Sequence, residues 1–302
     1  MILEAKAIKL VEIYLYICKR FDEDIKYYCE RFSNNKEPEF SDQEIMTIYL
    51  FAIQEEQRFQ IKQIHRFAKE YLLSWFPALG SYQAFNNRIN RLAEAFKMLL
   101  RPLLKESIPQ ECCLDQSLLD SLPIITSSGK RKPKVATEIV DKGRCSSKGI
   151  YYHGLKLHAL AFCRKGTLPF PEQLHITAAS ENDLTVFKTE WAQITNRTFW
   201  GDKIYYNRDF FNELEEKNNS IMLTPVKAIK GQSQQEKQRN KAADDLFSRA
   251  VSSVRQPIEA FFNWLIEKTD FQRANKVRST KGLLVHVFGK MAAAFIYLIF
   301  NS

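Results

Sequence analysis

An aspartate interrupts an apolar stretch of the sequence. The segment Leu118-Leu119-Asp120-Ser121-Leu122-Pro123-Ile124-Ile125 has the pattern of a short buried strand with one carboxylate inside it. An ionised carboxylate is costly in a protein interior unless a cation pairs with it. Asp120 therefore either ends the strand and begins a turn before Pro123, since Asp is common in turns, or it faces a cation. Carboxylates elsewhere in the chain decide between these two interpretations.

Two further carboxylates stand where they can join Asp120. Asp202 ends a predicted strand at residues 197–202, and Glu259 lies on a predicted helix late in the chain. The three carboxylates meet if the two strands are neighbours in a sheet and the helix packs across it. Carboxylates so close repel one another, and at least one takes up a proton unless cations are present. Two Mg²⁺ (or Mn²⁺) ions, roughly 3.5–4 Å apart, would neutralise them and clamp the attacking and leaving oxygens in phosphoryl transfer.

Residues 109–302 are predicted to hold these carboxylates on an α/β domain. Apolar runs predict five strands, at residues 118–125, 151–162, 173–177, 197–202 and 220–225. Helices are predicted at residues 182–194, at residues 208–216 and around an apolar stripe from Val254 to Leu265. This order predicts a five-stranded mixed sheet that is flanked by helices.

Residues 1–108 are predicted to form a separate, all-helical domain. Ser41, with Glu44 three residues later, has the pattern of a capping box, and an apolar stripe follows it. A later helix is expected to begin at Ser81 and to continue until Pro102 stops or kinks it. No catalytic constellation is evident in this part of the chain. DNA binding is expected of it because of the polar helix face described next.

The helix after Ser81 carries polar side chains that suit DNA. They are Asn86, Asn87, Arg88, Asn90 and Arg91. Asn and Arg near the start of a helix can contact base edges and phosphates in a major groove. The alternative is an ordinary solvated helix face, and the sequence alone favours neither.

The charge balance favours a polyanionic partner. The chain has 44 basic and 35 acidic side chains, a net charge of +9. Three of the cations, Lys130, Arg131 and Lys132, are adjacent in a predicted loop, and a basic tract follows from Lys227 to Lys241. Both are candidates for phosphate contacts. The alternative for the loop is a solvated surface turn far from DNA.

Cysteine use and hydropathy bear on the compartment. The six cysteines form no C-x-x-C pair, which disfavours zinc and a disulfide framework and favours reduced cysteines in a cytosolic protein. The first residues lack the pattern of a signal peptide. The apolar segment from Gly282 to Phe300 contains His286 and Lys290, so a buried helix is expected rather than a membrane span.

Several motifs resemble the DDE transposases of bacterial insertion sequences, in particular the insertion sequence 982 family, related to the insertion sequence 4 and 5 group. The resemblance extends over almost the whole chain and rests on the segment around Asp120 and on six others: Phe40–Glu44, Ser81–Arg88, Tyr151–His158, Gly201–Tyr205, Arg255–Glu259 and Lys281–His286. It implies an RNase H-like catalytic domain in which Asp120, Asp202 and Glu259 bind the metal ions. Asp115 is a weaker candidate for the first position. His158 and His286 resemble family positions and are interpreted as structural rather than as metal ligands.

The resemblance has departures around the third acid. Related transposases often carry a Tyr three residues before the Arg and a Lys seven residues after the Glu. Ser252 and Ile266 stand at these positions here, and Lys268 could substitute for the Lys. Arg255 lies one helical turn before Glu259, where it could bind a phosphate or orient Glu259 through a salt bridge.

The implied activity is DNA cleavage at the ends of an insertion sequence, followed by strand transfer into target DNA. The implied partners are double-stranded DNA (the terminal inverted repeats and the target) and a second copy of the chain in a homodimer, with no membrane. The expected location is the bacterial cytoplasm, on the nucleoid. The alternatives are a metal-dependent DNA endonuclease without strand transfer and an inactive relative that only binds DNA.

Overall fold

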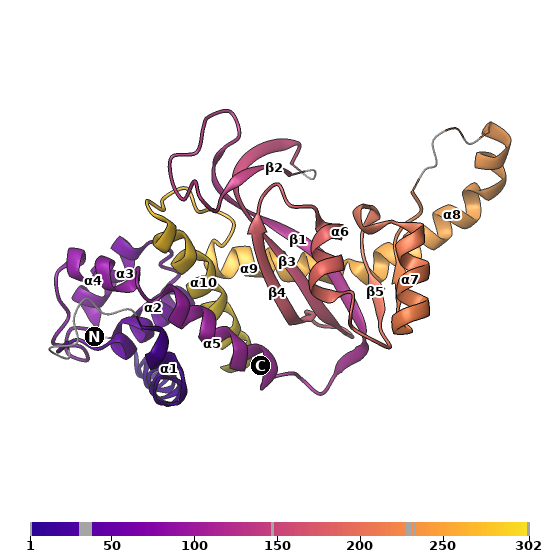
Figure 1. Ribbon diagram of the computed structural model, residues 1–302. Coiled ribbons are helices and arrows are strands. Elements are labelled where there is room, and N and C mark those ends of the chain that lie inside the picture. Colours follow the sequence, from indigo (N-terminus) through magenta and orange to yellow (C-terminus); the bar gives the residue numbers. More distant parts are fainter. Residues whose placement is uncertain (1, 30–37, 146–147, 228–230, 232, 301–302) are drawn as a thin grey trace.

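A mixed sheet lies beside a group of helices that contains both the first and the last helix of the chain (Figure 1). The computed structural model describes residues 2–29, 38–145, 148–227, 231 and 233–300. Lys230, in the basic tract, lies outside the described residues.

The first hundred residues form helices, as predicted. The capping box is present, because the Glu44 N–H donates to the Ser41 hydroxyl and the Ser41 N–H donates to the Glu44 carboxylate. The helices pack around a core of leucine, isoleucine and phenylalanine side chains. Their bounds are Glu4–Glu23 (α1), Ile25–Tyr28 (the 3₁₀ helix η1), Asp42–Glu56 (α2), Ile61–Tyr71 (α3), Tyr82–Ile89 (α4) and Ala93–Lys105 (α5).

The single helix predicted after Ser81 is wrong in its extent. Ser81 caps α4 by accepting from the Ala84 N–H, but α4 ends at Ile89. The Arg91 and Leu92 N–H groups donate to carbonyls only three residues back, which tightens the chain and redirects it into α5. Helix α5 then continues through Pro102 to Lys105. The apolar periodicity continues across this break, because both helices bury their apolar side chains in the same core.

The sheet is mixed and has β1 near its centre. Its strands are ordered β2-β3-β1-β5-β6, and β4 also pairs with β3. Strand β3 is antiparallel to β1, β2 and β4, whereas β5 is parallel to both β1 and β6. The bounds are Cys112–Ser128 (β1), Asp141–Cys145 (β2), Ile150–Arg164 (β3), Phe170–Ala178 (β4), Thr198–Trp200 (β5) and Ile221–Leu223 (β6).

Two features of the sheet differ from the prediction. Strand β1 is much longer than residues 118–125, and β2 adds a sixth strand to the predicted five. The sequence of β2, Asp-Lys-Gly-Arg-Cys, is polar, and only Gly143 and Cys145 in it are buried. Such a strand has little apolar alternation, so its pairing with β3 is what identifies it.

Helices cover both faces of the sheet (Figure 1). Leu119 and Leu160 pack with α6 (Asp183–Val186), the π-helical turn Phe187–Trp191 (η2) and α7 (Arg208–Asn218). Leu118 and Leu122 belong to the core that includes α9 (Pro257–Thr269). A further helix, α8 (Gln234–Arg255), leads into α9 and extends away from the body at its other end.

The C-terminal helix α10 (Thr280–Phe300) packs against α2 and α5. The Gln54 side-chain amide donates to the Ala293 carbonyl, and the core joins the N-terminal helices to α10. Among the described residues, α10 is the one helix long and apolar enough to cross a membrane, but it is mostly buried inside the protein. Its burial supports the prediction of a core helix. The division of the chain at residue 108 stays a prediction.

Candidate active site

The pairing of β1 with β5 brings Asp120 and Asp202 together. Leu118 is the register partner of Trp200 in this parallel pair. Asp120 lies two residues after Leu118, and Asp202 lies two residues after Trp200. Because the two strands are parallel, both aspartates lie at the same end of this short ladder. Asp202 then caps the 3₁₀ turn Lys203–Tyr205 (η3), because its Oδ1 accepts from the Ile204 N–H at 2.9 Å. The convergence predicted for these two aspartates is present.

Arg255 connects Asp120 to Glu259. Its Nη1 donates to Asp120 Oδ2 at 2.8 Å, and its Nη2 donates to the Glu259 carboxylate. Arg255 is the last residue of α8 and Glu259 lies in the first turn of α9. Pro257 separates the two helices because it has no N–H to continue the hydrogen-bond ladder. Gln256 keeps helical dihedral angles, so Arg255 and Glu259 stay one turn apart.

The site is electrostatically strained. Burial raises the pKa of the Asp120 carboxyl to about 6, against the opposing effect of the Arg255 guanidinium. Burial also raises the pKa of Asp202, and the negative charge of Glu259 adds to this effect. Asp120 and Asp202 thus resist ionisation in the folded protein, and added positive charge would stabilise their ionised forms.

A buried hydroxyl lies beside these carboxylates. Tyr205 is 1% exposed, and its Oη has no hydrogen-bond partner among the described residues. The charges of Asp120 and Asp202 help to raise the pKa of Tyr205 well above its usual value, after the larger effect of burial. Its ring also restricts Gly201, where an added Cβ would lie 2.8 Å from the Tyr205 ring. The turn after β5 therefore requires a glycine immediately before Asp202.

The sequence analysis missed a fourth carboxylate, Asp183. Its side chain is 3.1 Å from Lys156 Nζ and 3.3 Å from His158 Nδ1, and its charge helps to raise the pKa of both Asp120 and Asp202. Burial lowers the pKa of His158 to about 3, so its contact with Asp183 is not an ion pair near neutral pH. Lys156 and His158 are the two polar residues of the otherwise apolar stretch Leu155–Phe162. They require a polar partner and were the available signal for a buried acid.

One family matches this chain. Residues 118–296, more than half of the chain, match the transposase DDE domain. The chain belongs to the DDE transposase domain family. The matched region begins in β1, ends in α10 and contains Asp120, Asp202 and Glu259. No curated protein and no solved structure matched the chain.

The acidic groups of this DDE domain fit a divalent metal by their chemistry. Mg²⁺ and Mn²⁺ prefer carboxylate oxygens, and buried carboxylates with raised pKa values gain stability from a cation. The unpaired Tyr205 hydroxyl is a further polar group in the same place. Among the described residues, however, no three acidic, histidine or cysteine side chains are grouped as a metal site, and Arg255 bridges two of the candidates. The Arg255 guanidinium therefore has to move if metal ions are to share Asp120 and Glu259.

Several predicted DNA-binding residues of this transposase have other partners. Arg88 pairs with Asp42 and donates to the Phe40 carbonyl, so it links α4 to the start of α2. Lys268 lies 4.8 Å from the centre of the Tyr297 ring, against α10. It follows Glu259 by nine residues of helix, or about 180° of rotation, so the structure does not bring it to the carboxylates.

The remaining predicted DNA contacts are on or near the surface. Asn87 is exposed, Asn86, Asn90 and Arg91 are half-buried, and the loop cations Lys130, Arg131 and Lys132 are exposed after β1. Their DNA contacts stay predictions. Asp115 is exposed and lies within an irregularity of the β1–β3 pairing. His286 is buried and its Nε2 is 2.7 Å from the Phe271 carbonyl. Of the two departures, Ser252 is exposed and Ile266 is half-buried.

Proposed function

We propose that this transposase cleaves DNA at the ends of its insertion sequence and joins those ends to target DNA. The observation that supports the proposal most directly is the meeting of Asp120, Arg255 and Glu259, with Asp202 on the neighbouring strand. Transposase activity follows from the family, and the two-metal route and the strand transfer are our proposal.

In this mechanism Asp120, Asp202 and Glu259 hold two Mg²⁺ (or Mn²⁺) ions. When bound, such a pair stabilises the charge that develops on the attacking and leaving oxygens of a phosphodiester. The rigid pairing of β1 with β5 fixes Asp120 relative to Asp202, while α9 carries Glu259 across the sheet. Water would attack the phosphodiester at the element's end, and the freed 3′-hydroxyl would then attack target DNA. No covalent bond to the protein is needed.

Arg255 has two roles in this proposal. Without metal it pairs with half-buried Asp120 and exposed Glu259, which limits the repulsion between these two carboxylates. With bound cations in its place, the Arg255 guanidinium would be available to a DNA phosphate, for which its planar set of donors is suited. The salt bridge and the phosphate contact are then successive states of one side chain.

The sheet supports an RNase H-like assignment. With β2 set aside, three antiparallel strands (β4, β3 and β1) continue into two parallel ones (β5 and β6). We further propose membership of the insertion sequence 982 family, related to the insertion sequence 4 and 5 group, and action on duplex DNA as a homodimer in the bacterial cytoplasm. The net charge of +9 supports a nucleic-acid partner.

The decisive experiment incubates purified protein with Mg²⁺ and a labelled duplex that carries the terminal inverted repeat flanking its gene. Cleavage together with joined products is the expected result. Cleavage without joining would identify a plain endonuclease, and binding without cleavage would identify an inactive DNA-binding relative.

A further inference from the structure

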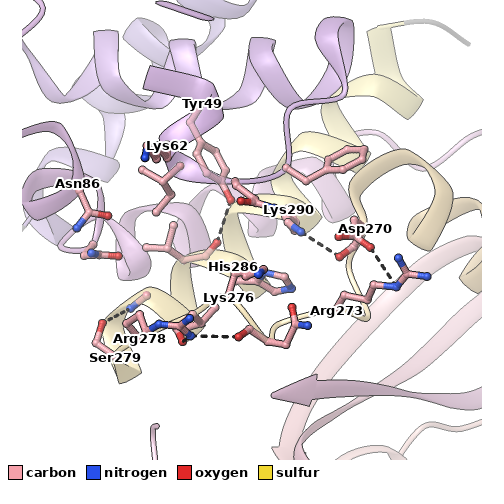
Figure 2. A pocket seen from close by; sticks show the side chains of 18 of the residues that line it. Tyr49, Lys62, Asn86, Asp270, Arg273, Lys276, Arg278, Ser279, His286 and Lys290 are labelled. Carbon is pink, nitrogen blue, oxygen red and sulfur yellow. Dashed lines mark hydrogen bonds and ion pairs between the residues drawn. The ribbon is translucent and has the colours of Figure 1, made fainter. Parts of the chain in front are cut away.

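A polar cavity of about 660 Å³ lies between the N-terminal helices and the loop that follows α9. Figure 2 shows Lys62 and Asn86 on the side of the N-terminal helices, with Arg273, Lys276 and Arg278 on the side of the loop. The mechanism proposed above assigns no role to this cavity. We call it the helix–loop pocket.

The helix–loop pocket is strongly cationic. Five basic side chains line it, and among the described lining residues Asp270 is the one acid. Four of the five are exposed, whereas Lys290 is 2% exposed. They are Lys62, Arg273, Lys276, Arg278 and Lys290. Burial lowers the pKa of Lys290 to about 7, so the positive charge of the pocket comes mainly from the four exposed side chains. A cluster of positive charge attracts a polyanion.

Asparagine side chains supply further polar groups on the α4 side. Asn86, Asn87 and Asn90 all line the helix–loop pocket. The Oδ1 atom of Asn90 is buried and has no hydrogen-bond partner among the described residues. The predicted DNA-binding face of α4 thus shares one cavity with cations that are almost two hundred residues later in the chain.

The helix–loop pocket is joined directly to the strand that carries Asp120. The Ile125 N–H donates to the Gln272 carbonyl at 2.8 Å, and the Ala274 N–H donates to the Ile125 carbonyl at 2.9 Å. Ile125 follows Asp120 by five residues in β1, or roughly 17 Å of extended strand. A duplex that runs along β1 would cover that distance in about five base pairs, at about 3.4 Å per base pair.

We propose that the helix–loop pocket binds the phosphate backbone of the DNA duplex about five base pairs from the bond that is cleaved. Arg273, Lys276 and Arg278 hold the phosphates from the loop, and the asparagines of α4 contact the same backbone from the other side. The proposal rests on the proposed function. In this proposal α4 and the loop after α9 together form one site for the DNA backbone. Helix α4 then contacts phosphates and does not by itself recognise bases in the major groove.

The first test measures duplex binding as a function of salt. The triple variant Arg273→Gln, Lys276→Gln, Arg278→Gln is compared with Lys19→Gln, Arg101→Gln, Lys105→Gln, which removes three exposed charges from α1 and α5, outside the pocket. Because the pocket variant no longer neutralises three phosphates, its plot of log affinity against log salt should become shallower by up to about 2.7, which corresponds to a loss of roughly a hundredfold near 0.15 M salt. The control should keep the wild-type slope. Equal slopes for the two variants would overturn the proposal.

The second test locates the contact. Single neutral methylphosphonate groups replace successive phosphates of the element-end duplex. Wild-type affinity should fall most for groups about five base pairs from the cleaved bond, and the pocket variant should be insensitive to those groups. Uniform sensitivity along the duplex in both proteins would refute the assignment. If the wild type cleaves DNA and the pocket variant binds DNA as the control variant does, this inference fails but the proposed function stands. If none of the three proteins cleaves DNA, the result counts against the proposed function itself.

Discussion

Lys290 offers a quantitative test of the packing of α10. Its side chain is 2% exposed, and its Nζ donates to the Asp270 carbonyl at 3.0 Å and lies 5.6 Å from the centre of the Phe59 ring. Burial lowers the pKa of this ammonium from 10.5 to about 7. We predict that Lys290→Met stabilises the protein, and that the gain depends on pH.

The sign and size follow from proton linkage. Between pH 7 and pH 10.5 the unfolded chain holds the Lys290 proton more tightly than the folded chain does, so wild-type stability rises with pH over this window. At about 1.4 kcal/mol per pKa unit, the buried charge costs roughly 5 kcal/mol at pH 6 and roughly 2 kcal/mol at pH 9. The Met variant loses one hydrogen bond, worth about 1 kcal/mol. Its expected advantage is therefore about 4 kcal/mol at pH 6 and about 1 kcal/mol at pH 9.

The assay is urea unfolding of both proteins at several pH values, with the free energy of unfolding compared at each pH. Other groups titrate alike in both proteins and cancel in the difference. His286 is the neighbour whose pKa Lys290 affects, and burial lowers that pKa to about 3, so it stays neutral throughout. Lys105→Met, at an exposed position on α5, is the control and should show no such pH dependence. If the difference in unfolding free energy between Lys290→Met and the wild type is the same at pH 6 and pH 9, Lys290 is not buried as described.

Three further predictions concern the candidate active site and the loop after β1. The three carboxylates are those of Asp120, Asp202 and Glu259. Replacing any one of them by alanine should abolish Mg²⁺-dependent cleavage and leave duplex binding nearly intact. A variant that still cleaves at the wild-type rate would show that its residue is not catalytic. Arg255→Met should destabilise the metal-free protein by roughly 1–3 kcal/mol at pH 7.5, because it leaves a largely buried carboxylate unpaired. The loss should shrink at pH 5, below the Asp120 pKa of about 6, and urea unfolding at the two pH values checks both statements. Replacing the loop cations Lys130, Arg131 and Lys132 by alanine should reduce the slope of log affinity against log salt by up to about three, equally on element-end and random duplex. An unchanged slope would show that the loop does not contact DNA.

Local features of this chain were predictable because short-range rules determine them. The Ser41 capping box needs two residues three positions apart, and apolar runs identify strands such as β3 by their own composition. Asp120 could be singled out because a carboxylate in an apolar strand needs a partner. Asp202 and Glu259 joined it as candidates through their places in the predicted elements and through the family resemblance.

The errors have equally specific causes. Strand β2 has a polar sequence, so only its pairing with β3 reveals it. The break between α4 and α5 is invisible because both halves continue one apolar pattern into one core. The sequence also did not reveal that Arg88 pairs with Asp42 of another helix, and its contact with DNA stays a prediction.

The sequence by itself determined which residues can carry charge, ligate metal or bury apolar surface, and where most of the helices and strands lie. Only the tertiary structure decided that Trp200 lies in register with Leu118, that Arg255 reaches Asp120, and that the loop after α9 faces α4 across a basic cavity. The physical reason is range. Helical and extended periodicity come from hydrogen bonds and side-chain spacing within a few residues. The meeting of groups far apart in the sequence depends instead on how whole elements bury their shared surfaces.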